Sequence, residues 1–247
     1  MRLSTPGMIR RCLTAVALLS APAVLAANFT VSPVRVELSP RQPSFALTVR
    51  NESADEPVII QLQPLAWSQS EGREVYAPTT EILATPPIFT IPAGGVQIIR
   101  VAARRPAVDG EGAFRLLLKE VPGPRKPEFA GVQIALEMNL PIFVKPQATV
   151  APVLDWKVVR ETGGRLRLTA GNRGNAHAQV ANLVLSAAGS EEPLVTVSGF
   201  AYVLPGQERG WSLDPRPGMS FPADGRLHLK AYSDASPVDT ELVAEPR

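Results

Sequence analysis

The sequence predicts an all-β protein made of two β-sandwiches in series, and three observations support this prediction. The chain has 25 Pro and 18 Gly among 247 residues, too many for long helices, because Pro lacks an amide donor and clashes with the preceding turn. Apolar residues alternate with polar ones over short runs that end at Gly, Pro or Asn turns, as in a β-sandwich. The length allows one large or two medium domains, and 45% hydrophobic residues exclude a disordered chain.

The first 26 residues predict a secretory signal peptide. Arg2, Arg10 and Arg11 form a basic start, an apolar stretch covers residues 13–19, and Val-Leu-Ala at 24–26 suits a cleavage site. A retained N-terminal anchor is the alternative, but this apolar stretch falls well short of the ~20 residues of a spanning helix. We therefore expect an exported mature chain that starts at residue 27.

Composition excludes several classes of function for the mature chain. Without the signal peptide it has 22 basic and 23 acidic residues, a net charge of −1, so we expect no nucleic-acid partner. The single Cys, Cys12, lies in the signal peptide, so the mature chain has neither disulfides nor Cys-based metal sites. It has only two His and neither a P-loop nor a Gly-x-Ser-x-Gly motif. We expect no cofactor, no metal and no catalytic residues, although a triad assembled from distant residues would not show as a motif.

The first domain is predicted to span residues 27–147. Its candidate strands cover residues 28–38 (broken at Ser32-Pro33), 45–49, 58–62, 88–91, 96–101, 114–121 and 132–144. The segment Lys-Pro-Gln-Ala at 145–148 then leaves the last strand, and Ala151-Pro152 precedes a new start. We therefore place the domain boundary near residue 147.

The second domain is predicted to span residues 148–247 and repeats the same pattern. Its candidate strands cover residues 166–168, 179–185, 194–197 and 226–232, with turns at 163–164, 171–172 and 224–225. We interpret Trp67, Trp156 and Trp211 as core aromatics. His177, after an Asn-Arg-Gly-Asn turn, is interpreted as a hydrogen-bonding turn or core residue rather than a ligand.

One segment carries an unusually regular apolar row. Alternate positions from 132 to 140 are all apolar, and in a strand they share one face: Val132, Ile134, Leu136, Met138 and Leu140. This row either packs into its own core, or belongs to an edge strand whose apolar face another chain must cover. A Pro-rich stretch, 121–127, precedes it and suits a loop that is not a tight hairpin.

Four motifs together resemble the PapD-like periplasmic pilus chaperones of the chaperone–usher family. They are Ser-Pro-Val-Arg-Val-Glu-Leu at 32–38, Phe-Arg-Leu-Leu-Leu-Lys-Glu-Val-Pro at 114–122, Leu-Pro-Ile-Phe-Val at 140–144 and Leu-Thr-Ala-Gly-Asn-Arg-Gly-Asn-Ala-His at 168–177. Each is weak alone, but they occur in order and cover nearly the whole mature chain. The Leu-Pro-Ile-Phe-Val variant looks most similar to the archaic branch, whose subunits resemble spore-coat-U-like proteins.

The resemblance implies a periplasmic, non-enzymatic protein of two immunoglobulin-like sandwiches set at an angle. Such chaperones bind pilus subunits that lack their last strand, and they lend their own G1 strand to fill the groove. Main-chain hydrogen bonds complete the subunit's sheet, and alternate apolar side chains fill its core. An outer-membrane usher then exchanges the chaperone for the next subunit.

The resemblance also implies roles for individual residues. The row Val132, Ile134, Leu136, Met138, extended to Leu140, becomes the donor strand. Arg35 matches the cleft arginine that binds the subunit's C-terminal carboxylate, a task that suits a forked guanidinium. The family's second basic residue, a Lys at the end of the donor strand, is replaced here by Asn-Leu-Pro at 139–141. We expect Arg100 or Arg115 to supply it, in preference to Lys145.

Two functions from different classes stay open at this point. The first is the periplasmic chaperone, which could also form a self-capping oligomer through its apolar row when it holds no subunit. The second is a self-contained surface or binding module of a pilus system, whose row packs into its own core. Whether the row is exposed distinguishes the two.

Overall fold

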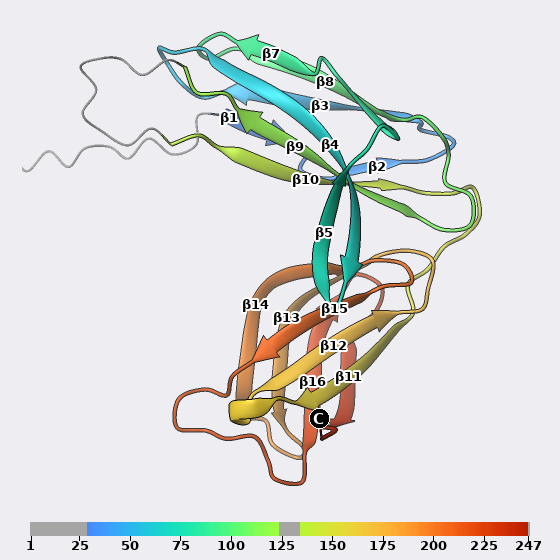
Figure 1. Cartoon of the computed structure of the whole chain (residues 1–247), viewed down its shortest axis with the longest axis vertical. Helices are drawn as coiled ribbons and strands as arrows, with labels where there is room; N and C mark the ends of the chain where they lie inside the picture. Colours follow the sequence, from blue (N-terminus) through green and yellow to red (C-terminus); the bar gives the residue numbers. More distant parts are fainter. Residues whose placement is uncertain (1–28, 124–133, 247) are drawn as a thin grey trace, which may run out of the picture.

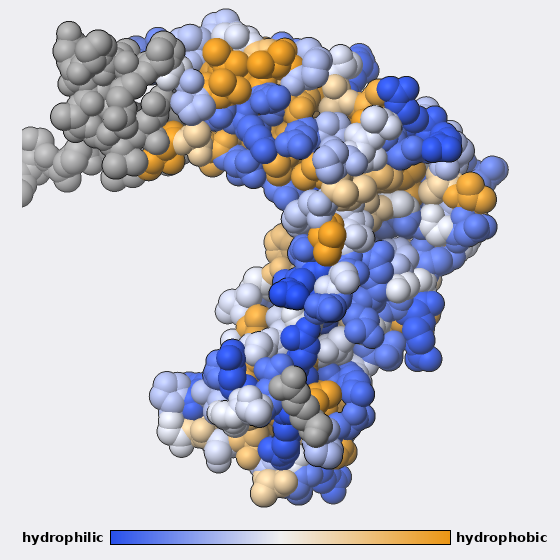
Figure 2. Space-filling view, viewed as in Figure 1, coloured by the Kyte–Doolittle hydropathy of each residue, from blue (hydrophilic) through white to orange (hydrophobic). Residues whose placement is uncertain are grey.

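The chain folds into two β-sandwich domains, which confirms the predicted all-β class. The computed structural model describes residues 29–123 and 134–246, so the predicted signal peptide and Val132 lie outside the described residues. This part of the chain contains no α-helix, only a 3-10 turn at Thr162–Gly164. The two domains follow each other along the long axis and meet at an angle, which leaves one side of the molecule concave (Figures 1 and 2).

The first domain packs two sheets face to face around an apolar core. One sheet has the order β1-β3-β8-β6, and the other has the order β2-β10-β9-β4-β5, with β7 also paired to β4. Leu47, Ile99 and Leu116 are among the core side chains with no exposed surface. The strands are β1 (Phe29–Ser32), β2 (Val36–Leu38), β3 (Ser44–Asn51), β4 (Val58–Ser70), β5 (Arg73–Pro78), β6 (Ile82–Thr85), β7 (Ile88–Ile91), β8 (Val96–Ala103), β9 (Gly112–Glu120) and β10 (Glu137–Val144).

The first strand changes sheets at Ser32-Pro33, and this leaves part of β10 unpaired. Before the change, β1 pairs antiparallel with β3. After it, β2 runs parallel to β10 but covers only Ile142–Val144. On its other side, β10 pairs with β9 along its whole length. Among the residues that the structure describes, 137–141 of β10 therefore form an open sheet edge.

The second domain follows a link at residues 145–153. Its sheets have the orders β11-β12-β15 and β14-β13-β16-β17. Leu166, Leu168, Leu227 and Leu229 lie fully buried between them. The strands are β11 (Leu154–Arg160), β12 (Leu166–Asn172), β13 (Ala178–Ala187), β14 (Pro193–Val203), β15 (Glu208–Leu213), β16 (Arg226–Ser233) and β17 (Val238–Val243).

Some strand boundaries differ from the prediction for identifiable reasons. The strand predicted over 132–144 starts at Glu137 within the described residues. The strand predicted to end at Leu62 continues through Pro64 to Ser70. Pro64 is tolerated because β7 pairs with residues 58–61 and β5 with residues 65–70, so the proline lies where β4 changes neighbours. The apolar pattern does not reveal β5, β6, β11, β15 and β17, because most of their side chains are exposed or half-buried.

We expect Leu118→Ala to destabilise the first domain far more than Leu83→Ala. Leu118 has no exposed surface, whereas Leu83 is 42% exposed on an edge strand. Truncating a buried leucine costs about 2–5 kcal/mol, and a surface change stays within about 0.5 kcal/mol. Urea denaturation followed by circular dichroism measures both, and equal losses would contradict this assignment of the core.

Candidate functional site

Two arginines lie on either side of Pro141 on the outward face of the larger first-domain sheet. The parallel register pairs Val36 with Ile142, so the preceding Arg35 lies level with Pro141. Across the other edge of β10, Pro141 is the register partner of Arg115. Val36 and Leu116, which follow the two arginines along the chain, are fully buried in the core, so both guanidinium groups face outward. Two strand spacings place their backbones about 10 Å apart.

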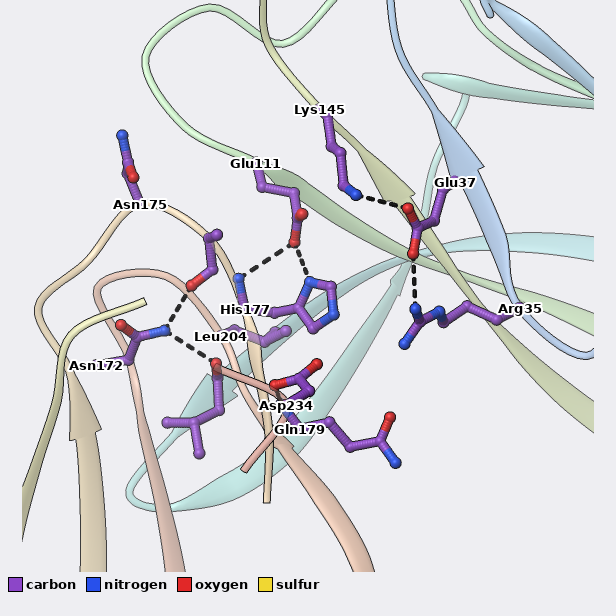
Figure 3. Close-up of polar contacts among 12 residues, drawn as sticks. Arg35, Glu37, Glu111, Lys145, Asn172, Asn175, His177, Gln179, Leu204 and Asp234 are labelled. Carbon is purple, nitrogen blue, oxygen red and sulfur yellow. Dashed lines mark hydrogen bonds and ion pairs between the residues drawn. The ribbon is translucent and has the colours of Figure 1, made fainter. Parts of the chain in front are cut away.

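Arg35 belongs to a three-residue charge cluster. Its Nη2 lies 2.8 Å from Glu37 Oε1, and Lys145 Nζ lies 2.5 Å from the other Glu37 oxygen (Figure 3). Burial lowers the pKa of Arg35, but hydrogen bonding with Tyr202 and the negative charge of Glu37 outweigh that effect and raise it. The structure therefore brings Lys145, the less favoured candidate, beside Arg35. Glu37 follows Arg35 by two residues and therefore lies on the same face of the extended chain as Arg35.

Arg115 lies in an aromatic environment. Its guanidinium carbon is 3.6 Å from the centre of the Trp67 ring and 5.8 Å from that of Tyr202. Its Nε is buried and has no hydrogen-bond partner among the described residues. Burial lowers the pKa of Arg115, although Tyr76 and Glu74 favour its charged form. A guanidinium nevertheless stays protonated near neutral pH, so the sheet face holds a cation stacked on Trp67.

Arg100 is not brought to this face. It lies on β8 in the opposite sheet, between its register partners Ala46 and Thr85. Its chain neighbours Ile99 and Val101 point into the core, so its side chain projects to the far side of the sandwich. The expectation that Arg100 could act beside Arg35 is therefore corrected by the packing of the two sheets.

An aromatic cluster joins the two domains next to the arginines. It consists of three aromatic side chains, those of Trp67, Phe143 and Tyr202, together with Leu204, and all four are buried. Tyr202 contacts Trp67 edge-on, with ring centres 5.5 Å apart, and lies 5.3 Å from Phe143. Trp67 is thus buried between the domains rather than inside a sandwich. Trp156 and Trp211 pack against the second core, with ring centres 6.0 Å apart.

His177 extends this junction with a buried polar contact. Its ring stacks on Phe143 with a centroid separation of 3.6 Å and an interplanar angle of 7°. Its Nδ1 contacts Glu111 Oε1, and its backbone N–H donates to the same oxygen at 3.2 Å. Both side chains are almost fully buried. Glu111 sits in what the sequence shows only as a Gly-Glu-Gly turn, so its role required the tertiary structure.

A hairpin arm, residues 65–78, reaches from the first domain to the second (Figure 1). It is built from the end of β4 and from β5. Gln69 Nε2 donates to the carbonyl of Tyr202 at 2.7 Å, and Gln69 Oε1 accepts from Leu204 N–H at 3.0 Å. At the tip, Gly210 N–H donates to the Gly72 carbonyl at 3.0 Å. Gly72 has φ +75°, and a Cβ there would lie 2.8 Å from Gly210 N, so this close approach requires glycine.

A cleft of about 320 Å³ opens between the domains at the charge cluster. Its lining combines ionisable side chains from both domains: Arg35, Glu37, Glu111 and Lys145 from the first domain, and His177 and Asp234 from the second (Figure 3). Such a cleft can accept an anionic group beside Arg35 and Lys145.

The apolar row leaves the core step by step along the chain. Leu140 is only 4% exposed and belongs to the first-domain core. Met138 and Leu136 are half-buried against that core, and Ile134 is 80% exposed. Leu136 N–H donates to Glu120 Oε2 at 3.0 Å, and Leu136 O accepts from Glu120 N–H at 2.9 Å. Because Leu140 already fills its own core, the side chains available to a partner are those from Met138 towards residue 134.

Two further classes of feature are not found in the part of the chain described. No helix there is long and apolar enough to cross a membrane. No group of three or more His, Cys, Asp or Glu side chains there is arranged to hold a metal ion.

Comparison with known proteins gives the same fold. Residues 28–150 match the family of pili and flagellar-assembly chaperones, PapD N-terminal domain. A search of curated protein sequences gave no match. Several solved structures share the architecture over most of the chain, at identities that establish the fold alone.

Three of these structures illustrate the similarity. A chain of the CsuC–CsuE chaperone–tip adhesion subunit complex, from archaic Csu pili of Acinetobacter baumannii, is 19% identical with a TM-score of 0.65; the match covers 90% of this chain and 100% of that chain. A chain of the Salmonella enterica SafA pilin–SafB chaperone complex is 19% identical, with a TM-score of 0.55 and coverages of 87% and 95%. The Pseudomonas aeruginosa CupB2 chaperone is 17% identical, with a TM-score of 0.52 and coverages of 87% and 100%.

The two angled sandwiches and the cleft between them define a chaperone of the chaperone–usher class, which is not an enzyme class. The match over the first domain places the chain more closely: it belongs to the PapD-like pilus chaperones.

We expect Gln69→Leu to loosen the contact between the domains. The change leaves the buried Leu204 N–H and Tyr202 carbonyl without partners, and each such group costs about 1–3 kcal/mol. Small-angle X-ray scattering should show a larger radius of gyration, and the link 145–153 should be cut faster by protease. Gln61→Leu, at an exposed position of the same strand, is the control. Unchanged scattering and cleavage would show that the arm does not hold the domains together.

Proposed function

We propose that this protein captures pilus subunits by lending them the apolar row at the start of β10, and delivers them to an outer-membrane usher. The observation that supports this most directly is the combination of an open sheet edge at 137–141 with a row whose side chains emerge from the core. An incoming strand could pair with that edge through main-chain hydrogen bonds.

The energetics favour a partner over solvent. Ile134 exposes most of its surface and Leu136 and Met138 part of theirs. Complete burial of such a side chain contributes about 1.5–3 kcal/mol before ordering costs are subtracted. An exposed apolar row beside an open edge is also an aggregation hazard, which a bound subunit would remove.

The cleft supplies an anchor for the end of the bound chain. Arg35 and Lys145 converge on one carboxylate in the free protein, so the geometry suits a second carboxylate at the subunit's C-terminus. Arg115 lies across Pro141 from Arg35 and adds positive charge to the same face. We therefore assign the anchor to Arg35 with Lys145 and Arg115, and not to Arg100.

The family and the predicted signal peptide support the cellular setting of this function. We infer a periplasmic location after removal of residues 1–26, and subunits of the incomplete immunoglobulin-like or spore-coat-U-like kind. Similarity to the archaic Csu complex supports that subunit class. We also propose that the chaperone can associate with itself through the same row when it holds no subunit.

We expect Ile134→Asp to abolish subunit capture while the protein stays folded. The side chain is 80% exposed in the free protein, so a charge there is tolerated until a subunit core must bury it. The tagged mature protein is recovered from its own periplasm, and mass spectrometry identifies what it holds. Ile98→Asp, 56% exposed on the opposite sheet, is the control.

The outcomes separate the two candidate functions. Small secreted β-rich subunits held by the native protein and by Ile98→Asp, but at least ten-fold depleted from Ile134→Asp, would support strand lending. Empty native protein in cells that express the neighbouring secreted subunits would overturn it and favour the self-contained surface module.

We expect Arg35→Ala to reduce capture at least ten-fold and Arg100→Ala to leave it unchanged. Removing one partner of a charge pair that becomes buried on binding costs about 2–5 kcal/mol, and only Arg35 lies in the cleft. The same capture measurement decides between them. A loss with Arg100→Ala but not with Arg35→Ala would place the anchor on the opposite sheet.

A further inference from the structure

Glu37 occupies the position that an incoming carboxylate would need. One of its oxygens contacts the Arg35 guanidinium at 2.8 Å, and the other contacts the Lys145 ammonium at 2.5 Å. The side chain is 35% exposed and lines the interdomain cleft, so it is accessible from the side on which a ligand would enter. Glu37 therefore bridges two of the three cations of the proposed anchor, Arg35 and Lys145, with its own carboxylate (Figure 3).

This bridge is set by the β2–β10 ladder rather than by flexible loops. Glu37 is the register partner of Phe143, and the Lys145 N–H donates to the carbonyl of the adjacent Leu38 at 2.8 Å. Arg35 lies two residues earlier on the same face of the strand. The backbone thus holds all three charged groups together in the free protein.

The charge state of Glu37 supports this arrangement. Burial raises the pKa of Glu37, but the hydrogen bond from Lys145 and the charges of Lys145 and Arg35 outweigh that effect and lower it. Glu37 is therefore an anion near neutral pH. A second carboxylate entering the cleft meets both its repulsion and its competition for the same donors.

We propose that Glu37 is a resident counter-ion of the carboxylate anchor: it holds Arg35 and Lys145 in the empty protein and yields them to the chain-terminal carboxylate of a bound subunit. This inference rests on the proposed carboxylate anchor and adds a residue that weakens binding. Glu37 keeps two cations paired when the cleft is empty, and it makes the captured carboxylate easier to release.

The test measures binding of N-acetylglycine, a minimal chain-terminal carboxylate, to the full mature protein. Side-chain ¹⁵N NMR of the Arg35 Nε–H follows the titration, with N-acetylglycinamide as the uncharged reference. Glu37→Gln keeps the shape and hydrogen-bonding oxygen but removes the charge. Glu81→Gln is the matched control, because Glu81 pairs with Arg105 at 2.6 Å in the same domain, and the cleft lining does not include it.

We expect Glu37→Gln to bind N-acetylglycine about two- to five-fold more tightly than the native protein, as for loss of one partly exposed competing charge. Glu81→Gln should match the native protein, and N-acetylglycinamide should not discriminate between the variants. Equal thermal midpoints for the two Gln variants would exclude a folding defect as the cause.

Two results would overturn the inference, and they differ in what they imply. Equal or weaker binding by Glu37→Gln, with clear carboxylate binding by the native protein, would make Glu37 a positioning residue for Arg35 and leave the proposed anchor intact. No response of Arg35 to N-acetylglycine in any variant would remove the anchor itself, and with it any role for Glu37 as its competitor.

Discussion

The change of sheet at Ser32-Pro33 is the constraint on which the site depends. It places one half of the first strand in the smaller sheet and the other half beside β10. Because β2 is only three residues long, it supports the buried end of β10 and leaves residues 137–141 open. The same short strand puts Arg35 level with Pro141 and Glu37 level with Phe143. The open edge and the charged cleft therefore come from one local feature.

The second domain completes this site because it places Tyr202 next to Arg115. The centre of the Tyr202 ring, from β14, lies 5.8 Å from the guanidinium carbon of Arg115, and Tyr202 helps to raise the pKa of Arg35. It is held by ring contacts with Trp67 and Phe143, and by the hydrogen bond that Gln69 of the arm makes to its carbonyl. Rotation of one domain against the other would break these contacts together. The cleft can thus present its charges in one geometry.

The sequence alone predicts the fold class and the apolar row. Most of the residues around the cleft are not predictable from it, because they depend on contacts between residues that are distant in the chain. Alternation predicted the row from 132 to 140, but the pattern is identical for Leu140, which packs in the first-domain core, and for Ile134, which precedes β10 and is exposed. The position of Arg100 in the opposite sheet was not predictable, because spacing along the chain does not say which sheet a strand joins. Lys145 joins the site through its backbone hydrogen bond to Leu38 in the first domain, and Glu111 and Tyr202 join it through the packing of the two domains.

The proposed anchor and the apolar row would contribute differently to recognition of a subunit. Apolar burial and main-chain pairing are tolerant of register, yet a slip of one residue turns every side chain of a strand to the opposite face. A carboxylate held in the cleft marks the end of the partner chain at a fixed distance from the row, because Arg35 and the row are tied to the same strand, β10. In the proposed complex the charge contact would select the register, and the row would supply most of the stabilisation. A resident anion at Glu37 fits this division, since it weakens the contact that aligns the chain without altering the apolar row.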